Sequence, residues 1–236
     1  MAGSGRTDIR AVLFDKDGTL FGYEATWAAW CERVLTELAD VRAALAEDMA
    51  QASGYDVASR SFRAGSLIVN GAVDEIIALW HSKVPHHSPD HINQVSLRHL
   101  ESLPNVPVCD FGTVLGQLRA SGRALGIATN DYEASARAQL KEADADGFFT
   151  FFAGVDSGQG SKPDPGMIEA FCRVLDLPAS AVAMVGDSTH DLNAGRAAGV
   201  GMNVAVLSGP AGHDDLSPFA DIVLTDISEL PRVFDI

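Results

Sequence analysis

Short runs of apolar residues recur along the chain and predict the strands of a parallel sheet. These runs lie at 11–14, 124–128, 148–153, 182–185, 202–206 and 222–224. Segments of helical length separate most of the later runs, at about 131–142, 165–176 and 189–198. Strands that alternate with helices are joined by crossover connections, which is typical of parallel β-α-β units. The pattern therefore predicts an α/β fold with a doubly wound parallel sheet.

About a hundred residues separate the first two runs, and their pattern is helical instead. Apolar residues recur there every three or four positions, within 27–41, 73–80 and 92–100. This spacing places apolar side chains along one face of a helix. We therefore expect residues 22–102 to form an all-helical domain that is inserted into the main domain. The main domain would then consist of residues 1–21 and 103–236.

Two aspartates stand where the first predicted strand ends. Asp15 and Asp17 are two positions apart, a spacing that places both side chains on the same side of an extended chain. Lys16 alternates away from them, and we expect it to have a structural role. Gly18 permits a tight turn, and Thr19 can form local hydrogen bonds there. Ligands of doubly wound sheets bind outside the carboxyl ends of the strands, so the two carboxylates predict a site at this edge.

Further polar residues follow later strands. Thr129 and Asn130 come directly after the second strand, where a hydroxyl at a helix N-terminus can bind phosphate. Lys162 precedes a proline-rich helix start and would supply a positive charge. Asp187 ends another strand, and Asp191 opens the helix that follows. The spacing of Asp191 from the preceding serine also fits a capping box, so a metal-supporting role and a purely capping role both stay open.

Four segments resemble the motifs of the haloacid dehalogenase-like phosphatases, especially the phosphoglycolate phosphatase-like branch. They are residues 14–20 (FDKDGTL), 127–130 (IATN), 160–165 (GSKPDP) and 185–191 (VGDSTHD). The resemblance implies a Rossmann-like core with a helical cap inserted after the first motif. It also implies a Mg²⁺-dependent phosphatase that hydrolyses a small-molecule phosphate monoester through an aspartyl-phosphate. Members of the family often have an apolar residue where this chain has Lys16.

The resemblance also assigns a role to each motif residue. Asp15 would be the nucleophile, and Asp17 would act first as the general acid and then as the general base. The phosphoryl oxygens would be held by Thr129, Asn130 and Lys162. The magnesium ion would be held by the Asp15 carboxylate, the Asp17 backbone carbonyl and Asp187, with Asp191 in support.

Two arginines of the insert are candidates for substrate specificity. Arg60 and Arg63 lie between helical stretches, and a guanidinium group can bind a substrate carboxylate through two hydrogen bonds. The alternative is a pair of surface arginines without a ligand. Phosphoglycolate, which carries a carboxylate, is the substrate that the resemblance favours. A phosphomutase of the same family and a phospho-accepting signalling domain are the competing functions.

Composition narrows the range of partners. The net charge of -15 and the absence of a long basic run argue against binding to nucleic acid. No apolar stretch reaches the roughly 18 residues that a membrane span requires, and the first ten residues lack the apolar core of a secretion signal. The three cysteines are odd in number and form no C-x-x-C pair, which fits a reducing cytoplasm. We therefore expect a cytoplasmic enzyme whose partner is a small-molecule phosphate ester.

Overall fold

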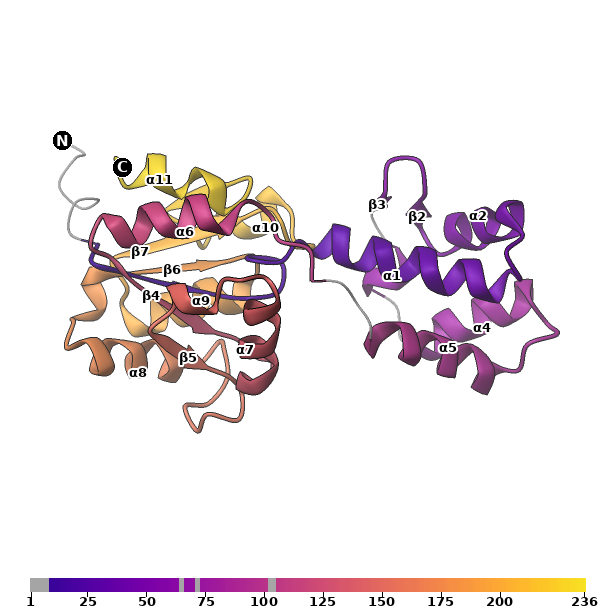
Figure 1. Cartoon of the computed structure of the whole chain (residues 1–236), viewed down its shortest axis with the longest axis horizontal. Helices are drawn as coiled ribbons and strands as arrows, with labels where there is room; N and C mark the ends of the chain where they lie inside the picture. Colours follow the sequence, from indigo (N-terminus) through magenta and orange to yellow (C-terminus); the bar gives the residue numbers. More distant parts are fainter. Residues whose placement is uncertain (1–8, 64–65, 71–72, 102–104) are drawn as a thin grey trace. The chain divides into compact units, whose positions relative to one another are not determined.

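The computed structural model describes residues 9–63, 66–70, 73–101 and 105–236. The chain folds into two compact units, one formed by Met1–Tyr23 with Pro107–Ile236 and the other by Glu24–Val106 (Figure 1). The second unit is therefore an insertion between two parts of the first. The expected domain boundaries stay a prediction, and the one between residues 102 and 103 lies outside the described residues.

A parallel sheet forms the centre of the first unit. Among the described residues its six strands are β1 (Ala11–Phe14), β4 (Ala124–Ala128), β5 (Phe151–Ala153), β6 (Val182–Gly186), β7 (Met202–Val206) and β8 (Ile222–Leu224). Their order is β5-β4-β1-β6-β7-β8, and all neighbouring strands are parallel. The last residue of β1, Phe14, pairs with Ile127 on one side and Val185 on the other. The predicted α/β class and doubly wound sheet are confirmed.

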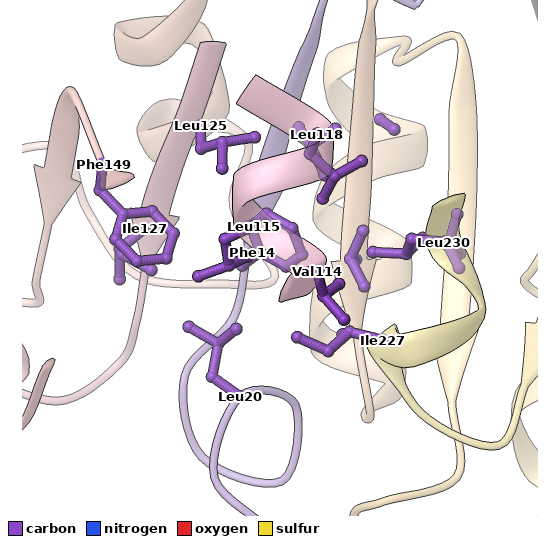
Figure 2. Packing of buried hydrophobic residues seen from close by; sticks show 14 of the residues in the cluster. Phe14, Leu20, Val114, Leu115, Leu118, Leu125, Ile127, Phe149, Ile227 and Leu230 are labelled. Atoms are coloured by element: carbon purple, nitrogen blue, oxygen red, sulfur yellow. The ribbon is translucent and has the colours of Figure 1, made fainter. Parts of the chain in front are cut away.

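The apolar run of β1 is buried on both faces of the sheet, as expected for a parallel strand covered by helices. Val12 and Phe14 pack into one apolar cluster, and Ala11 and Leu13 pack into another on the opposite side. Figure 2 shows Phe14 among residues that come from separate elements, including Leu115 of the helix that follows the insert. These contacts fix the end of β1, and with it the position of the residues that follow.

Helices cover both faces of this sheet (Figure 1). One apolar cluster receives side chains from α6 (Phe111–Ala120), α7 (Glu133–Glu142) and α11 (Leu230–Val233). The other receives them from α8 (Gly166–Leu175) and α9 (Thr189–Ala198). The remaining described elements of this unit are η1 (Asp146–Phe148), η2 (Ala179–Ala181), α10 (His213–Leu216) and η3 (Ile227–Glu229).

The inserted unit has its own apolar core and is mainly helical. Its helices are α1 (Tyr23–Leu38), α2 (Ala43–Ala52), α3 (Leu67–Asn70), α4 (Val73–Lys83) and α5 (Pro89–Glu101). Trp80 and Leu35 are buried in its core, where the indole of Trp80 also donates a hydrogen bond to Ser53. The unit departs from the expected all-helical domain in one respect, because β2 (Tyr55–Asp56) and β3 (Ser61–Phe62) form a short antiparallel pair.

Candidate active site

Three buried aspartates meet at the carboxyl edge of the sheet. Asp15 directly follows β1, and its N–H extends the strand pairing by donating to the carbonyl of Val185 at 2.9 Å. Asp187 directly follows the neighbouring strand β6, and Asp191 lies in the first turn of α9. One ligand atom from each of these three carboxylates lies within 4.8 Å of the others. The structure thus brings together acids that are as much as 176 residues apart along the chain.

Lys162 is the positive charge at the centre of this acidic group. Its Nζ lies 2.5 Å from Asp15 Oδ1 and 2.5 Å from Asp191 Oδ1, and its side chain is buried. The side chain of Asn130 fixes the Lys162 backbone, because its Oδ1 accepts from the Lys162 N–H at 2.9 Å and its Nδ2 donates to the Lys162 carbonyl at 3.0 Å. The Asn130 side chain, expected at the phosphoryl oxygens, is therefore already used to position Lys162.

Thr129 is buried beside the acids, but not at the start of a helix. α7 begins only at Glu133, with Tyr132 as its N-cap residue, so the expected helix N-terminus next to Thr129 is wrong. The Thr129 Oγ1 instead accepts a hydrogen bond from the Asp131 N–H at 3.0 Å. This contact still leaves the hydroxyl proton of Thr129 as a donor toward the cavity that Thr129 lines.

Asp191 caps the start of α9 and also lies among the acids of the site. Its Oδ2 accepts hydrogen bonds from the N–H and Oγ of Ser188, at 3.0 and 2.6 Å, and the Ser188 Oγ accepts from the Asp191 N–H. This reciprocal pair is a capping box at the start of α9. The other oxygen, Oδ1, faces Lys162. The capping role is thus confirmed, and the same carboxylate belongs to the site.

Lys16 does not alternate away from Asp17, and the expectation that it would was wrong. β1 ends at Phe14, and the chain then turns, because the N–H groups of Leu20 and Phe21 both donate to the Lys16 carbonyl. The Lys16 side chain is buried, with its Nζ 2.8 Å from Asp17 Oδ2 and 3.1 Å from Asp131 Oδ2. Its Nζ also donates to Gln139 Oε1.

Two glycines allow the chain to pass close to Asp187. Gly18 has a φ of +82°, and a Cβ added to it would lie 2.2 Å from Asp187 Oδ2. A Cβ on Gly209 would lie 1.8 Å from the same oxygen. The hydroxyl of Thr19 donates to Asp187 Oδ1 at 3.3 Å. Gly209 was missed in the sequence, although a glycine shortly after a predicted strand is a signal of close backbone approach.

The buried acids and Lys162 line a cavity of about 480 Å³ in the first unit. Asp15, Asp17, Thr129 and Lys162 contribute to its wall, as do residues to which the sequence analysis assigned no role. The latter include Tyr23, Asp131, His190 and Pro210. The cavity therefore gathers the predicted residues of all four motifs around one space.

The excess of buried acid perturbs the ionisation of the site. Burial raises the pKa of Asp15 to about 7, opposed by Lys162 and reinforced by Asp191 and Asp17. Burial, with the charges of Asp15 and Asp191, raises the pKa of Asp187 to about 8. Burial alone would lower the pKa of Lys162, but the two carboxylates beside it raise that pKa above its ordinary value. A divalent cation would relieve this repulsion, and closely spaced carboxylate oxygens are the ligands that Mg²⁺ prefers.

The two arginines predicted to select substrate form ion pairs within the inserted unit. Arg60 Nη2 lies 3.2 Å from Glu32 Oε2, and Arg63 Nη2 lies 3.4 Å from Asp56 Oδ2. Both guanidinium side chains are more than half exposed, at 58% and 54%. Their role in substrate selection stays a prediction.

Comparison with known proteins identifies the family. The model of the haloacid dehalogenase-like hydrolases matches residues 9–199. A phosphoglycolate phosphatase from Rhodospirillum rubrum is 30% identical over 195 residues, which cover 81% of this chain and 77% of that protein. The pyrophosphatase PpaX from Listeria monocytogenes is 26% identical over 227 residues, which cover 94% of each chain.

Solved structures show the same fold. A HAD family hydrolase from Deinococcus radiodurans, crystallised with phosphate and sodium, has a TM-score of 0.70 at 21% identity and covers 96% of this chain and 97% of its own. A subfamily IA hydrolase from Geobacter sulfurreducens has a TM-score of 0.65 at 19% identity and covers 97% of both chains.

The fold places the chain in the α/β class, and the family match over residues 9–199 shows that the chain belongs to the haloacid dehalogenase-like hydrolases. The predicted membership in this family and its phosphoglycolate phosphatase-like branch is confirmed, as is the prediction of a phosphatase. Within the described part of the chain, the helices are too short or too polar to cross a membrane.

Proposed function

We propose that this protein is a Mg²⁺-dependent phosphatase that hydrolyses a small-molecule phosphate monoester through a phosphorylated Asp15. One observation carries the proposal. Asp15 is buried at the carboxyl edge of the sheet, where it contacts Lys162 and lies beside the carboxylates of Asp187 and Asp191. Three buried acids beside a single lysine are costly to ionise together, which supports a role for them in binding a cation and, through it, an anionic substrate.

The residues present fit a magnesium ion. Asp15, Asp187 and the backbone carbonyl of Asp17 would hold it, and Asp191 would support it by fixing Lys162 and the start of α9. Such an ion offsets the repulsion between a carboxylate nucleophile and a phosphate dianion, and it stabilises charge on the phosphoryl oxygens.

The first chemical step transfers the phosphoryl group to Asp15. An oxygen of the Asp15 carboxylate forms a bond to phosphorus, and the bond from phosphorus to the ester oxygen breaks. Asp17, at the rim of the cavity, donates its proton to the departing alkoxide. The Thr129 hydroxyl and the Lys162 ammonium donate to the phosphoryl oxygens, whose charge must be stabilised as the bonds change.

The second step releases phosphate. Asp17, now a carboxylate, takes a proton from water as the water oxygen bonds to phosphorus. The bond from phosphorus to Asp15 breaks, so the nucleophile returns as a carboxylate and inorganic phosphate leaves. Because one residue serves as acid and then as base, both half-reactions depend on the placement of Asp17.

A small carboxylated ester such as phosphoglycolate is the substrate class that we favour. A phosphatase named for that ester is 30% identical to this chain. Arg60 and Arg63 are proposed to bind the substrate carboxylate, exchanging their ion pairs with Glu32 and Asp56 for it. The free state of all three cysteines is consistent with action in the cytoplasm. A pyrophosphate substrate is the second candidate, because the pyrophosphatase PpaX matches over 94% of this chain.

A panel of phosphate compounds with Mg²⁺ tests the proposal. It includes phosphoglycolate, pyrophosphate, glycerol phosphate and p-nitrophenyl phosphate, and phosphate release is the measurement. Asp15→Asn is the blank, and Asp214→Asn, at a fully exposed carboxylate, is the matched control. We expect turnover by the wild type and the control and none by Asp15→Asn. Steady release by folded Asp15→Asn would exclude the nucleophile.

Phosphomutase and phospho-accepting functions give different results in the same panel. A phosphomutase would move the group between positions of a sugar phosphate with little net release. A phospho-accepting domain would retain a stable phosphate on Asp15 and show no steady turnover. The exposed carboxylate of Asp17 on the cavity wall favours an enzyme, because a phospho-acceptor needs no proton donor there.

A further inference from the structure

We propose that Lys16 is a positioning residue for Asp17. Its buried ammonium group ties the Asp17 carboxylate to the loop that follows β4, and this tie holds Asp17 at the rim of the cavity. The inference rests on the proposed function, in which Asp17 carries the proton. Lys16 does not line the cavity, so it would affect the reaction through Asp17, which does.

The Lys16 side chain is buried, and its ammonium group has an acceptor for each of its donors. The residue is 1% exposed, which makes its charge costly unless each donor finds a partner. An ammonium group has three N–H donors. The described structure provides three acceptor side chains within reach, which are Asp17, Asp131 and Gln139. The amine is therefore satisfied only when the Asp17 carboxylate completes the set.

Two of these three partners are themselves fixed. Asp131 accepts hydrogen bonds from the Tyr132 N–H at 2.7 Å and from the Ser135 Oγ at 2.7 Å, and its own N–H donates to Thr129. Gln139 lies within α7. Asp131, held by its own hydrogen bonds, and Gln139, carried by α7, thus anchor the Lys16 amine.

The third partner depends on Lys16. The Asp17 side chain is 60% exposed, and within the described residues Lys16 supplies its side-chain hydrogen bond and its ion pair. A carboxylate this exposed would otherwise rotate among several staggered positions. The restraint therefore runs from α7, through Lys16, to Asp17. It also couples the loop after β1, which carries the nucleophile, to the loop after β4, which carries Thr129.

The competing explanation is that Lys16 only neutralises Asp131 and fills space beneath the loop. That role predicts a loss of stability with an equal effect on all substrates. The positioning role predicts a loss confined to proton transfer, because misplacing a general acid impairs the step in which it acts. An alkyl phosphate needs that acid in order to lose its alkoxide, whereas a nitrophenolate leaves with little help.

The test compares Lys16→Met and Lys16→Arg with Lys141→Met, an exposed lysine of α7 that serves as the control. Steady-state constants are measured for glycerol phosphate. Single-turnover phosphorylation of Asp15 is measured with p-nitrophenyl phosphate, and thermal unfolding monitors the fold. We expect Lys16→Met to lower kcat for the alkyl ester about tenfold to a hundredfold, with KM within about twofold. Single-turnover phosphorylation by the aryl ester changes by less than about threefold, and Lys16→Arg restores most of kcat.

A double-mutant cycle with Asp17→Asn makes the inference specific. If Lys16 acts through Asp17, Lys16→Met causes little further loss once Asp17 is asparagine. If Lys16→Met does not fold, Asp131→Asn is used instead, because this change weakens the ion pair that anchors Lys16. It should likewise lower kcat for the alkyl ester and leave single-turnover phosphorylation by the aryl ester nearly unchanged. An equal loss with both esters, or a full additional loss in the Asp17→Asn background, overturns the role of Lys16. Absence of turnover by the wild type would instead overturn the proposed function, and this inference with it.

Discussion

Replacing Asp187 by asparagine should stabilise the metal-free protein while it inactivates the enzyme. The side chain is buried, with ligand atoms of Asp15 and Asp191 within 4.8 Å. Burial and these two neighbouring charges raise its pKa to about 8, from 3.8 for a free carboxyl. Asparagine has nearly the same shape, can still accept from Thr19, and carries no charge.

The sign of the effect follows from linkage. A carboxyl whose pKa is higher in the folded state binds its proton more tightly there, so the fold loses stability as the pH rises. The loss begins near the unfolded pKa of 3.8 and is complete above the folded pKa of about 8. Each tenfold change in proton affinity corresponds to about 1.4 kcal/mol. The loss in the free energy of unfolding that Asp187 causes at pH 9 is therefore at most about 6 kcal/mol. Asp15 is coupled to Asp187 and shares the cost of the repulsion, so we expect a gain of about 2–4 kcal/mol in the free energy of unfolding.

Thermal unfolding in the presence of a chelator measures this gain. At pH 9 the Tm of Asp187→Asn should exceed that of the wild type by roughly 5–15 °C, and the difference should shrink as the pH falls toward 4. Mg²⁺ should raise the wild-type Tm more at pH 9 than at pH 5, and it should raise that of the variant much less. Phosphatase activity of the variant should fall at least about a hundredfold. Asp214→Asn, which is fully exposed, should change neither property.

Two results would refute this reasoning. The first is a lower Tm for the variant at pH 9 without metal, which would mean that the carboxylate stabilises the fold. The second is a gain of the same size at pH 5 and pH 9, which would mean that packing, not charge, separates the two proteins. Either result would remove the argument that the acidic cluster is maintained at a cost to stability.

Three further predictions concern the loop after β1 and the inserted unit. Asp17→Asn should lower kcat for glycerol phosphate at least about tenfold more than it lowers single-turnover phosphorylation by p-nitrophenyl phosphate, and equal losses would argue against proton donation. Gly18→Ala should reduce kcat/KM at least about tenfold, because its φ is +82° and its Cβ would meet Asp187 at 2.2 Å; wild-type kinetics would show that the loop adapts freely. Arg63→Ala should lower kcat/KM for phosphoglycolate about tenfold and leave that for glycerol phosphate unchanged, whereas no change with either ester would exclude it from selection.

Much of the fold could be predicted because its strands are short apolar runs buried on both faces. The run at 11–14 became β1, and the expected helices at about 165–176 and 189–198 correspond to α8 and α9. The insert was visible because helical periodicity interrupts the alternation of strand and helix. The short β2–β3 pair of the insert could not be predicted, since strands of two residues contain too few positions to show a period.

Several details of the site were invisible for a related reason. The order of strands in a sheet cannot be derived from their order in the sequence. The pairing of β1 with β6 brings Asp187 beside Asp15, and it depends on the packing of the whole sheet. The amide of Asn130 anchors Lys162, which is 32 residues away, and no local pattern indicates that partner.

The sequence by itself determined which groups are available: the acids at the strand ends, the lysine before α8 and the glycines that allow tight turns. These follow from local geometry and from the residue types that the chemistry needs. The tertiary structure decided which of them meet. Lys16 shows the difference, because alternation predicted that it would lie away from Asp17, yet its Nζ contacts the Asp17 carboxylate. Its amine then binds Gln139, 123 residues along the chain, and holds Asp17 from a buried position.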